Sequence, residues 1–192
     1  YILSKKHHLL TIIDNTFLTP YLSTPLEQGA DIVLHSATKY IGGHNDVLAG
    51  VVTVKDDTLA EQLGQFHNMS GATLSPLDCY LLQRGLKTLH LRIERSQDNA
   101  RRLARRCETS DSIDEVLYSG KTGMLSLRLN KAYSVAKFLE NLEICIFAES
   151  LGGTETFITF PYTQTHVDMP DDEKDKRGID EHLIRLSIGI ED

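Results

Sequence analysis

Two short apolar runs, each stopped by a polar cluster, restrict the fold of this chain more than any other feature. Residues 9–13 (LLTII) lead directly into 14–16 (DNT), and residues 32–34 (IVL) lead into 35–39 (HSATK). Short continuous apolar runs are typical of strands buried on both faces of a parallel sheet. Residues 24–29 (TPLEQG) combine a capping threonine, a proline at the first helical position and a terminating glycine. The pattern predicts strand, helix and strand, which is the α/β arrangement.

The remainder of the first half continues this pattern. A third strand is predicted over 50–54 (GVVTV), after a Gly42-Gly43 turn, and a helix over 56–69. Ser75 and Pro76 are typical of the start of another helix. Apolar residues spaced by three, four and seven then predict a long amphipathic helix from about Leu86 through about residue 107.

After Gly120 the pattern changes to that of a smaller α/β unit. Residues 124–129 (MLSLRL) alternate between apolar and polar, as an antiparallel strand does. Further elements are predicted as a helix over 131–141 and strands over 155–160 and 183–188, with a solvated loop or helix start over 169–177. We therefore predict a second, smaller α/β unit in this part of the chain.

Composition excludes several classes of protein. The 192 residues are 41% hydrophobic and 24% charged, which is ordinary for a globular protein. No apolar run approaches the ~20 residues that a membrane span requires, and the net charge of −7 disfavours nucleic acid as a partner. Three scattered cysteines without a CxxC pair predict neither a disulfide framework nor a thiolate zinc site, so we expect a reducing, cytoplasmic compartment. The histidines lack a compact ligand spacing, and we expect no metal.

The two polar clusters follow strands that are neighbours in the predicted sheet. Because ligands bind outside the carboxyl ends of parallel strands, both clusters are expected at one cleft. Lys39 there is suited to Schiff-base chemistry, Ser36 and Thr38 to holding a phosphate, and Asp14 to pairing with a cationic ring nitrogen. The spacing alone is also compatible with an alternative, in which Lys39 is an ordinary surface residue and Asp14 is a turn residue. Strand alternation points His35 to the side opposite Ser36.

Four sequence blocks carry a resemblance to a known family. They are residues 14–50 (DNTFLTPYLSTPLEQGADIVLHSATKYIGGHNDVLAG), 82–89 (LQRGLKTL), 149–153 (ESLGG) and 185–192 (RLSIGIED). As a set they resemble the Cys/Met-metabolism, or trans-sulfuration, family of pyridoxal-phosphate (PLP) enzymes. The resemblance implies an aspartate-aminotransferase-like fold (fold type I), with 1–97 as the end of the large cofactor domain and 98–192 as the small domain.

The resemblance also implies roles for individual residues. Lys39 would bind PLP covalently and carry protons, Asp14 would pair with the pyridine nitrogen, and Ser36 and Thr38 would bind the phosphate. Arg185 would bind the substrate α-carboxylate, a task that suits its two-pronged donor. In the same way, Ser150 would contact the substrate, and Glu149 would mark members that carry out γ-chemistry.

The activity implied is of the cystathionine γ-synthase type, in which cysteine replaces the acyl group of an O-acylhomoserine to give cystathionine. Three alternatives stay open: a γ-lyase or a β-lyase of the same family, a non-catalytic truncated module without cofactor, and a cofactor-free Schiff-base lyase or aldolase. The last leaves Asp14 and the two hydroxyls without a role.

Length bears on the same resemblance. Family members are about twice as long, so the chain is expected to be a C-terminal half that lacks the upstream cofactor contacts. Relatives also usually carry a further stretch near Gly120 and a proline at the position of Ser119. For an intact protein we expect a homo-oligomer, a dimer of dimers, acting on small amino acids.

Overall fold

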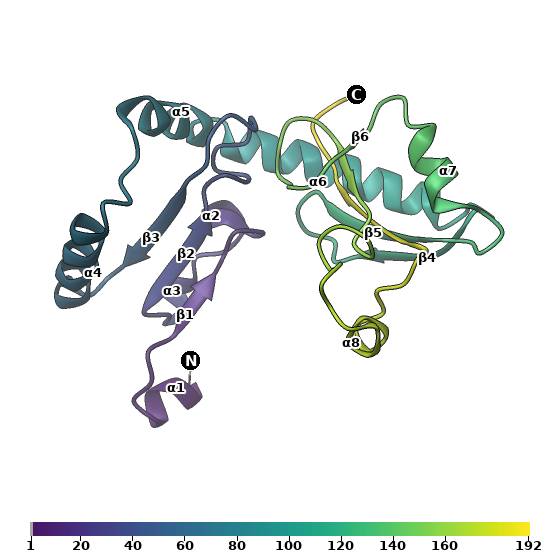
Figure 1. The fold of residues 1–192 in the computed structure, drawn as a ribbon. Helices are drawn as coiled ribbons and strands as arrows, with labels where there is room; N and C mark the ends of the chain where they lie inside the picture. The colour runs from purple at the N-terminus through teal and green to yellow at the C-terminus, as the bar shows by residue number, and fades with distance from the viewer. Residues whose placement is uncertain (1) are drawn as a thin grey trace. The chain divides into compact units, whose positions relative to one another are not determined.

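The computed structural model describes residues 2–192 and divides into two compact units between His90 and Leu91. The predicted boundary after residue 97 falls inside a helix, because α6 (Leu89–Cys107) runs on past the division. In chain order the first unit contains α1 (Ile2–Lys6), β1 (Ile12–Asp14), α2 (Thr19–Leu22), α3 (Pro25–Gln28), β2 (Ile32–Ser36), β3 (Gly50–Val54), α4 (Asp57–Ser70) and α5 (Pro76–Leu86) (Figure 1). The assignment of the two parts as cofactor domain and small domain stays a prediction.

The sheet of the first unit is mixed and has the order β1-β2-β3. β1 is parallel to β2, with Ile12 opposite Ile32, and β3 is antiparallel to β2. The prediction that the run 9–13 is a strand buried on both faces is wrong, since the strand begins only at Ile12 and that side chain is 57% exposed. Burial depends on what covers a strand, and β1 is an edge strand in the part of the chain described.

Local signals account for α4, α5 and the end of α3, whereas the predicted cap Thr24 makes no side-chain hydrogen bond to the start of α3. Asp56 accepts a hydrogen bond from the amide of Leu59 and caps α4, and Ser75 accepts one from Asp78 and caps α5. Gly29 ends α3 with a φ of 109°, a value that favours glycine. The predicted long helix begins at Leu89 rather than at Leu86.

Helix α5 packs directly on the turn that follows Lys39. A Cβ on Gly85 would stand 2.3 Å from the carbonyl oxygen of Gly42 and 2.7 Å from that of Ile41. Only glycine allows such a close approach of two backbones. The small apolar cluster around this contact contains Ala37, Ile41, Val47 and Leu82.

The second unit is built on one five-stranded sheet with the order β4-β5-β8-β7-β6. Its elements after α6 are β4 (Ile113–Tyr118), β5 (Met124–Leu129), α7 (Val135–Glu140), β6 (Ile146–Phe147), β7 (Phe157–Thr159), α8 (Asp171–Lys176) and β8 (Leu183–Ser187). The predicted strands β5, β7 and β8 are present, the predicted helix over 131–141 is confined to α7, and 171–176 is helical. No strand was predicted over the residues of β4 or β6.

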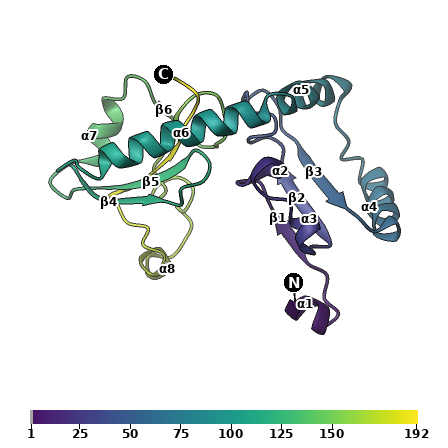
Figure 2. The same cartoon turned by 180° about the vertical axis from the view of Figure 1, so that it is seen from behind.

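Helix α6 lies across one face of this sheet (Figure 2). Its buried Ala100 and Ala104 pack against Leu125 and Leu127 of β5 and Ile184 of β8. The small alanine side chains let the helix approach the sheet closely, as the predicted amphipathic face requires. Among residues 2–192 no helix is both long enough and apolar enough to cross a membrane.

Candidate cofactor and substrate sites

Asp14 ends β1 as an exposed carboxylate. Its Oδ1 accepts a hydrogen bond from the backbone amide of Thr16 at 2.9 Å. Hydrogen bonds from Thr16 hold the pKa of Asp14 below its ordinary 3.8, outweighing partial burial, and the nearby His35 lowers it further. Asp14 is therefore an anion at neutral pH, as a partner of a cationic ring nitrogen must be.

Thr16 joins the carboxyl ends of the two parallel strands. Its Oγ1 accepts a hydrogen bond from the amide of Ser36 at 2.8 Å, and the amide of Asn15 donates to the carbonyl of Leu34 at 2.9 Å. Asp14 pairs with Leu34 in the register of β1 and β2, so Asp14 and Ser36 extend from the same face of the sheet. The structure thus brings together the strand ends that carry the predicted cofactor residues.

The turn after β2 carries Thr38 and Lys39, both half-buried. The amide of Lys39 donates to the carbonyl of Ser36 at 3.2 Å, and the Lys39 carbonyl accepts from the amide of Gly43 at 2.8 Å. The Thr38 hydroxyl accepts from the amide of Ala49 at 2.9 Å and donates to its carbonyl at 3.3 Å. Thr38 is therefore tied to the residue before β3, and its proton must turn away from that carbonyl to reach a phosphate.

His35 and Asn15 meet on the opposite face. His35 is buried, and its Nε2 lies 3.3 Å from the Asn15 amide nitrogen, which also donates to the carbonyls of Thr19 and Ser23 at 3.0 Å each. Thr19 is buried with a φ of 59°, a region that non-glycine residues rarely adopt. Sequence reasoning missed this role of Asn15 in holding the loop after Asp14. The available signal is an asparagine in the polar cluster that follows a strand.

Arg185 lies in the middle of β8 and is half-buried. Thr159 of β7 and Ser126 of β5 are its partners in strand register, and its Nη2 lies 3.5 Å from Thr159 Oγ1. Burial lowers the pKa of Arg185, while the carboxylate of Glu149 raises it. Arg185 and Glu149 are therefore within electrostatic reach of one another in the second unit.

The loop that carries Glu149 and Ser150 has an unusual backbone. Ser150 has a φ of 87°, and Gly152 has a φ of 80°. The amide of Gly152 donates to the Ser187 hydroxyl at 2.8 Å, and the carbonyl of Ala148 accepts from Thr159 Oγ1 at 3.0 Å. The loop is thus bound at both ends to the strands β7 and β8.

The end of the 185–192 block has a structural role. The Glu191 carboxylate accepts from the amide of Thr156 at 2.5 Å and from its hydroxyl at 2.9 Å. The Thr156 hydroxyl in turn accepts from the amide of Gly189 at 2.9 Å. A Cβ on Gly189 would stand 2.2 Å from the carbonyl oxygen of Thr154, so the two segments are in backbone contact there.

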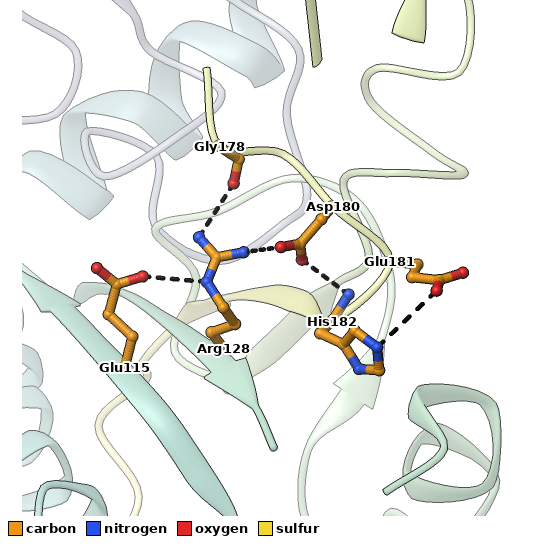
Figure 3. A network of polar contacts seen from close by, with 6 residues as sticks. All are labelled: Glu115, Arg128, Gly178, Asp180, Glu181 and His182. Carbon is orange, nitrogen blue, oxygen red and sulfur yellow. Dashed lines mark hydrogen bonds and ion pairs between the residues drawn. The ribbon is translucent and has the colours of Figure 1, made fainter. Parts of the chain in front are cut away.

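A polar network fixes the chain as it enters β8 (Figure 3). Arg128 of β5 donates to Glu115 of β4 at 3.0 Å, to the carbonyl of Gly178 at 3.2 Å, and to Asp180. Asp180 also accepts from the backbone amide of His182 at 2.9 Å. Arg128 thereby joins two strands to the turn that precedes the strand of Arg185.

The predicted residues form two groups, one in each unit. Asp14, Ser36, Thr38 and Lys39 form a group at the strand ends of the first unit, with an anion, hydroxyls and an amine. This donor set fits a phosphorylated, cationic heterocycle that carries an aldehyde. The second group, at β8 and the 148–152 loop, offers a guanidinium and a carboxylate, which match the charges of an amino acid.

Comparison with known proteins places these observations in a family. The family model for Cys/Met metabolism PLP-dependent enzymes matches residues 2–192. The chain is 55% identical over 189 residues to the cystathionine gamma-synthase/O-acetylhomoserine (thiol)-lyase of Bacillus subtilis, covering 98% of the chain and 51% of that protein. It is 52% identical over 190 residues to the cystathionine gamma-synthase of Haemophilus influenzae, covering 99% and 52%.

A lyase and a solved structure are also similar. The cystathionine beta-lyase of Lactococcus lactis is 45% identical over 205 residues, covering 98% of the chain and 54% of that protein. The crystal structure of cystathionine gamma-lyase from Lactobacillus plantarum with L-serine matches with a TM-score of 0.94 at 38% identity, covering 100% of the chain and 54% of that structure. This likeness confirms the predicted fold, and the chain spans about half the length of the curated relatives it matches. The chain belongs to the Cys/Met metabolism family of PLP-dependent enzymes.

Proposed function

We propose that this chain is part of a cystathionine γ-synthase, which joins an O-acylhomoserine to cysteine and releases the acyl group as a carboxylate. The observation that carries the proposal is the half-buried Arg185 guanidinium in β8, which lies beside Thr159 of β7 and has the charge that a substrate α-carboxylate requires. Glu149 lies within electrostatic reach of Arg185 and, through the resemblance to the family, marks members that carry out γ-chemistry. The two synthase-named relatives, at 55% and 52% identity against 45% for the β-lyase, support the same choice.

Lys39, Asp14, Ser36 and Thr38 are proposed to hold PLP. When bound, this cofactor accepts the electron pair left on the substrate Cα after its proton departs. Asp14, whose negative charge the hydrogen bonds from Thr16 stabilise further, would keep a proton on the pyridine nitrogen. Ser36 and Thr38 would donate hydrogen bonds to the phosphate, and Lys39 Nζ would be the amine that holds the cofactor through its aldehyde group.

Lys39 is also the proposed carrier of protons. Once the substrate amine has replaced it, the neutral Lys39 amine would take the proton from the substrate Cα and pass it on. Neutral again, it would take a proton from Cβ, so that the acyl group leaves Cγ as a carboxylate with the C–O electron pair. The cysteine thiolate adds at Cγ, and Lys39 returns protons to Cβ and Cα. Arg185 binds the α-carboxylate throughout this sequence, and Ser150 contacts the substrate beside it.

The location and assembly of the protein belong to the same proposal. We infer a cytoplasmic homo-oligomer, a dimer of dimers, whose small-molecule partners are amino acids. Exposed apolar side chains in the first unit support contact with further protein; they include Leu48 at 83%, Met69 at 81% and Phe66 at 70% exposure.

The test uses the full-length protein with an O-acylhomoserine and L-cysteine, and separately with L-cystathionine. Formation of cystathionine is expected, whereas release of 2-oxobutanoate or pyruvate from cystathionine would instead assign a γ-lyase or a β-lyase. A colourless protein with no visible absorbance would assign a non-catalytic module. Lys39→Ala abolishes activity, and Lys55→Ala, a change of an exposed lysine in the same unit, retains it.

A second measurement locates the cofactor. Reduction of the full-length protein with borohydride followed by peptide mapping is expected to find the cofactor on Lys39. Labelling of another lysine would contradict the assignment.

A further inference from the structure

Two buried hydroxyls bind the two ends of the 148–152 loop. Thr159 Oγ1 donates to the carbonyl of Ala148 at 3.0 Å, and Ser187 Oγ accepts from the amide of Gly152 at 2.8 Å. Thr159 is 1% exposed and Ser187 is 3% exposed, so water does not compete for these contacts. Between the two attachment points the loop carries Glu149 and Ser150.

Thr159 connects this loop to Arg185. A hydroxyl has one proton and two lone pairs, and the proton of Thr159 is directed to Ala148. Its oxygen therefore faces the Arg185 guanidinium as an acceptor, 3.5 Å from Nη2. Thr159 and Arg185 are also opposite one another in the register of β7 and β8, so the backbone holds this approach in place.

The backbone of the loop needs such attachment. Ser150 at a φ of 87° is a conformation that a non-glycine residue keeps only where its surroundings determine it. The contacts of Thr159 and Ser187 flank this residue, one on each side. Without them, the loop would be expected to relax and to carry Glu149 and Ser150 away from Arg185.

We propose that Thr159 and Ser187 are positioning residues for recognition of the substrate α-carboxylate: Thr159 orients the Arg185 guanidinium, and the two hydroxyls together hold the Glu149–Ser150 loop beside it. This inference rests on the proposed function, in which Arg185 binds that carboxylate. Neither hydroxyl takes part in the bond-making steps, so their loss should weaken binding more than turnover.

The experiment measures ligand binding to the full-length holoenzyme by the change in its visible absorbance. The probes are glycine, which carries an α-carboxylate, and methylamine, which lacks it. Thr159→Val is expected to lower the affinity for glycine about tenfold, the size expected for a hydrogen bond to a charged group. Ser187→Ala, which removes a neutral hydrogen bond, lowers it by about threefold. Methylamine binding is unchanged in both variants, and KM rises while kcat is retained.

Two controls make the result specific. Thr159→Ser restores the hydroxyl and with it the affinity for glycine, and Thr163→Val changes an exposed threonine in the same unit and has no effect. Wild-type affinity for glycine in both Thr159→Val and Ser187→Ala would overturn the inference. So would an equal loss for glycine and methylamine, because that indicates general damage.

A failure of the proposed role of Arg185 would give a different experimental result from a failure of the positioning role. If the wild-type protein binds glycine no better than methylamine, or if Arg185→Ala leaves the glycine affinity intact, Arg185 does not bind the carboxylate and both proposals are overturned. If Arg185→Ala lowers the affinity for glycine while Thr159→Val and Ser187→Ala do not, only the positioning role is overturned.

Discussion

The first and second units bury apolar side chains in different ways. In the second unit, α6 and the five-stranded sheet enclose a continuous core that includes Leu125, Ile158 and Ile184, each nearly inaccessible to solvent. In the first unit the corresponding cluster is small and centres on Ala37 and Ile41, while apolar side chains elsewhere in the unit lie exposed. The unit with the proposed cofactor residues is therefore the less self-sufficient of the two.

The difference follows from how each sheet is covered. The sheet of the second unit has a helix packed on it within its own 102 residues, from Leu91 to Asp192. The sheet of the first unit has three strands, and Ile12 on its edge strand is 57% exposed. The chain spans about half the length of the curated relatives it matches.

The largest expected effect comes from separating the units. Residues 89–192 expressed alone should unfold cooperatively in urea, because their core is complete. Residues 1–88 alone should show no cooperative transition, because they bury too little apolar surface to offset the loss of chain entropy. The chain has no tryptophan, so far-UV circular dichroism is the suitable measurement. A cooperative transition of residues 1–88 would remove the contrast between the units.

The next largest effect is expected from filling the close backbone contact in each unit. Gly85→Ala and Gly189→Ala should each destabilise their own unit by about 1–3 kcal/mol or more, because the new Cβ would overlap a carbonyl oxygen. Urea denaturation measures the loss. Gly64→Ala is the control, since its Cβ meets nothing within 4 Å in α4 and alanine favours a helix by about 1 kcal/mol. Equal behaviour of Gly64→Ala and Gly85→Ala would contradict the contact between α5 and the Ile41–Gly42 backbone.

A smaller effect is expected from the Arg128 network. Arg128→Met keeps the apolar stem and removes the hydrogen bonds to Glu115, Gly178 and Asp180. We expect the second unit to lose about 1 kcal/mol, a modest figure because the two carboxylates are half exposed. Thermal unfolding at low and high salt measures the loss, which should shrink at high salt. The matched change of the exposed Lys131 to Met should have little effect, and a similar loss there would argue against the network.

The smallest effect is a dependence of stability on pH in the first unit. Burial lowers the pKa of His35 below its ordinary 6.5, although Asp14 opposes the shift, so the folded state binds a proton less readily than the unfolded state. The resulting stability is fully present above pH 6.5 and is lost as the pH falls through 6.5 towards the lowered value. In the full-length protein, His35→Gln should flatten the stability profile over this range, whereas the exposed His7→Gln should leave it unchanged. Identical profiles for His35→Gln and the wild-type protein would rule out this coupling.

Several parts of the fold were predictable because their signals are local. The caps of α4 and α5 involve side chains and amides only three residues apart, and the alternation in β5 records which side chains face the core. The ends of β1 and β2, predicted at Ile13 and Leu34, lie at Asp14 and Ser36, so the polar clusters located them to within two residues. Each of the four blocks that indicated the family is likewise an uninterrupted stretch of sequence, and the family model agrees with them.

Other parts could not be predicted because they depend on residues distant in the chain. Ile12 belongs to an apolar run, yet its exposure depends on what lies beside β1. Thr159 and Ser187 have no local signal, since their partners Ala148 and Gly152 belong to another segment. The same holds for Gly85, whose need for glycine arises from a turn more than forty residues earlier in the chain.

By itself, the sequence determined the α/β pattern, the family and the residue types available for chemistry, because short-range periodicity and contiguous motifs carry that information. Only the tertiary structure decided how those residues are supported. It set the hydrogen bond from Ser36 to Thr16 between the two strand ends, the approach of α5 to the turn after Lys39, and the attachment of the Glu149 loop to β7 and β8. Hydrogen bonds and steric contacts between distant segments depend on the packed fold, so no local pattern records them.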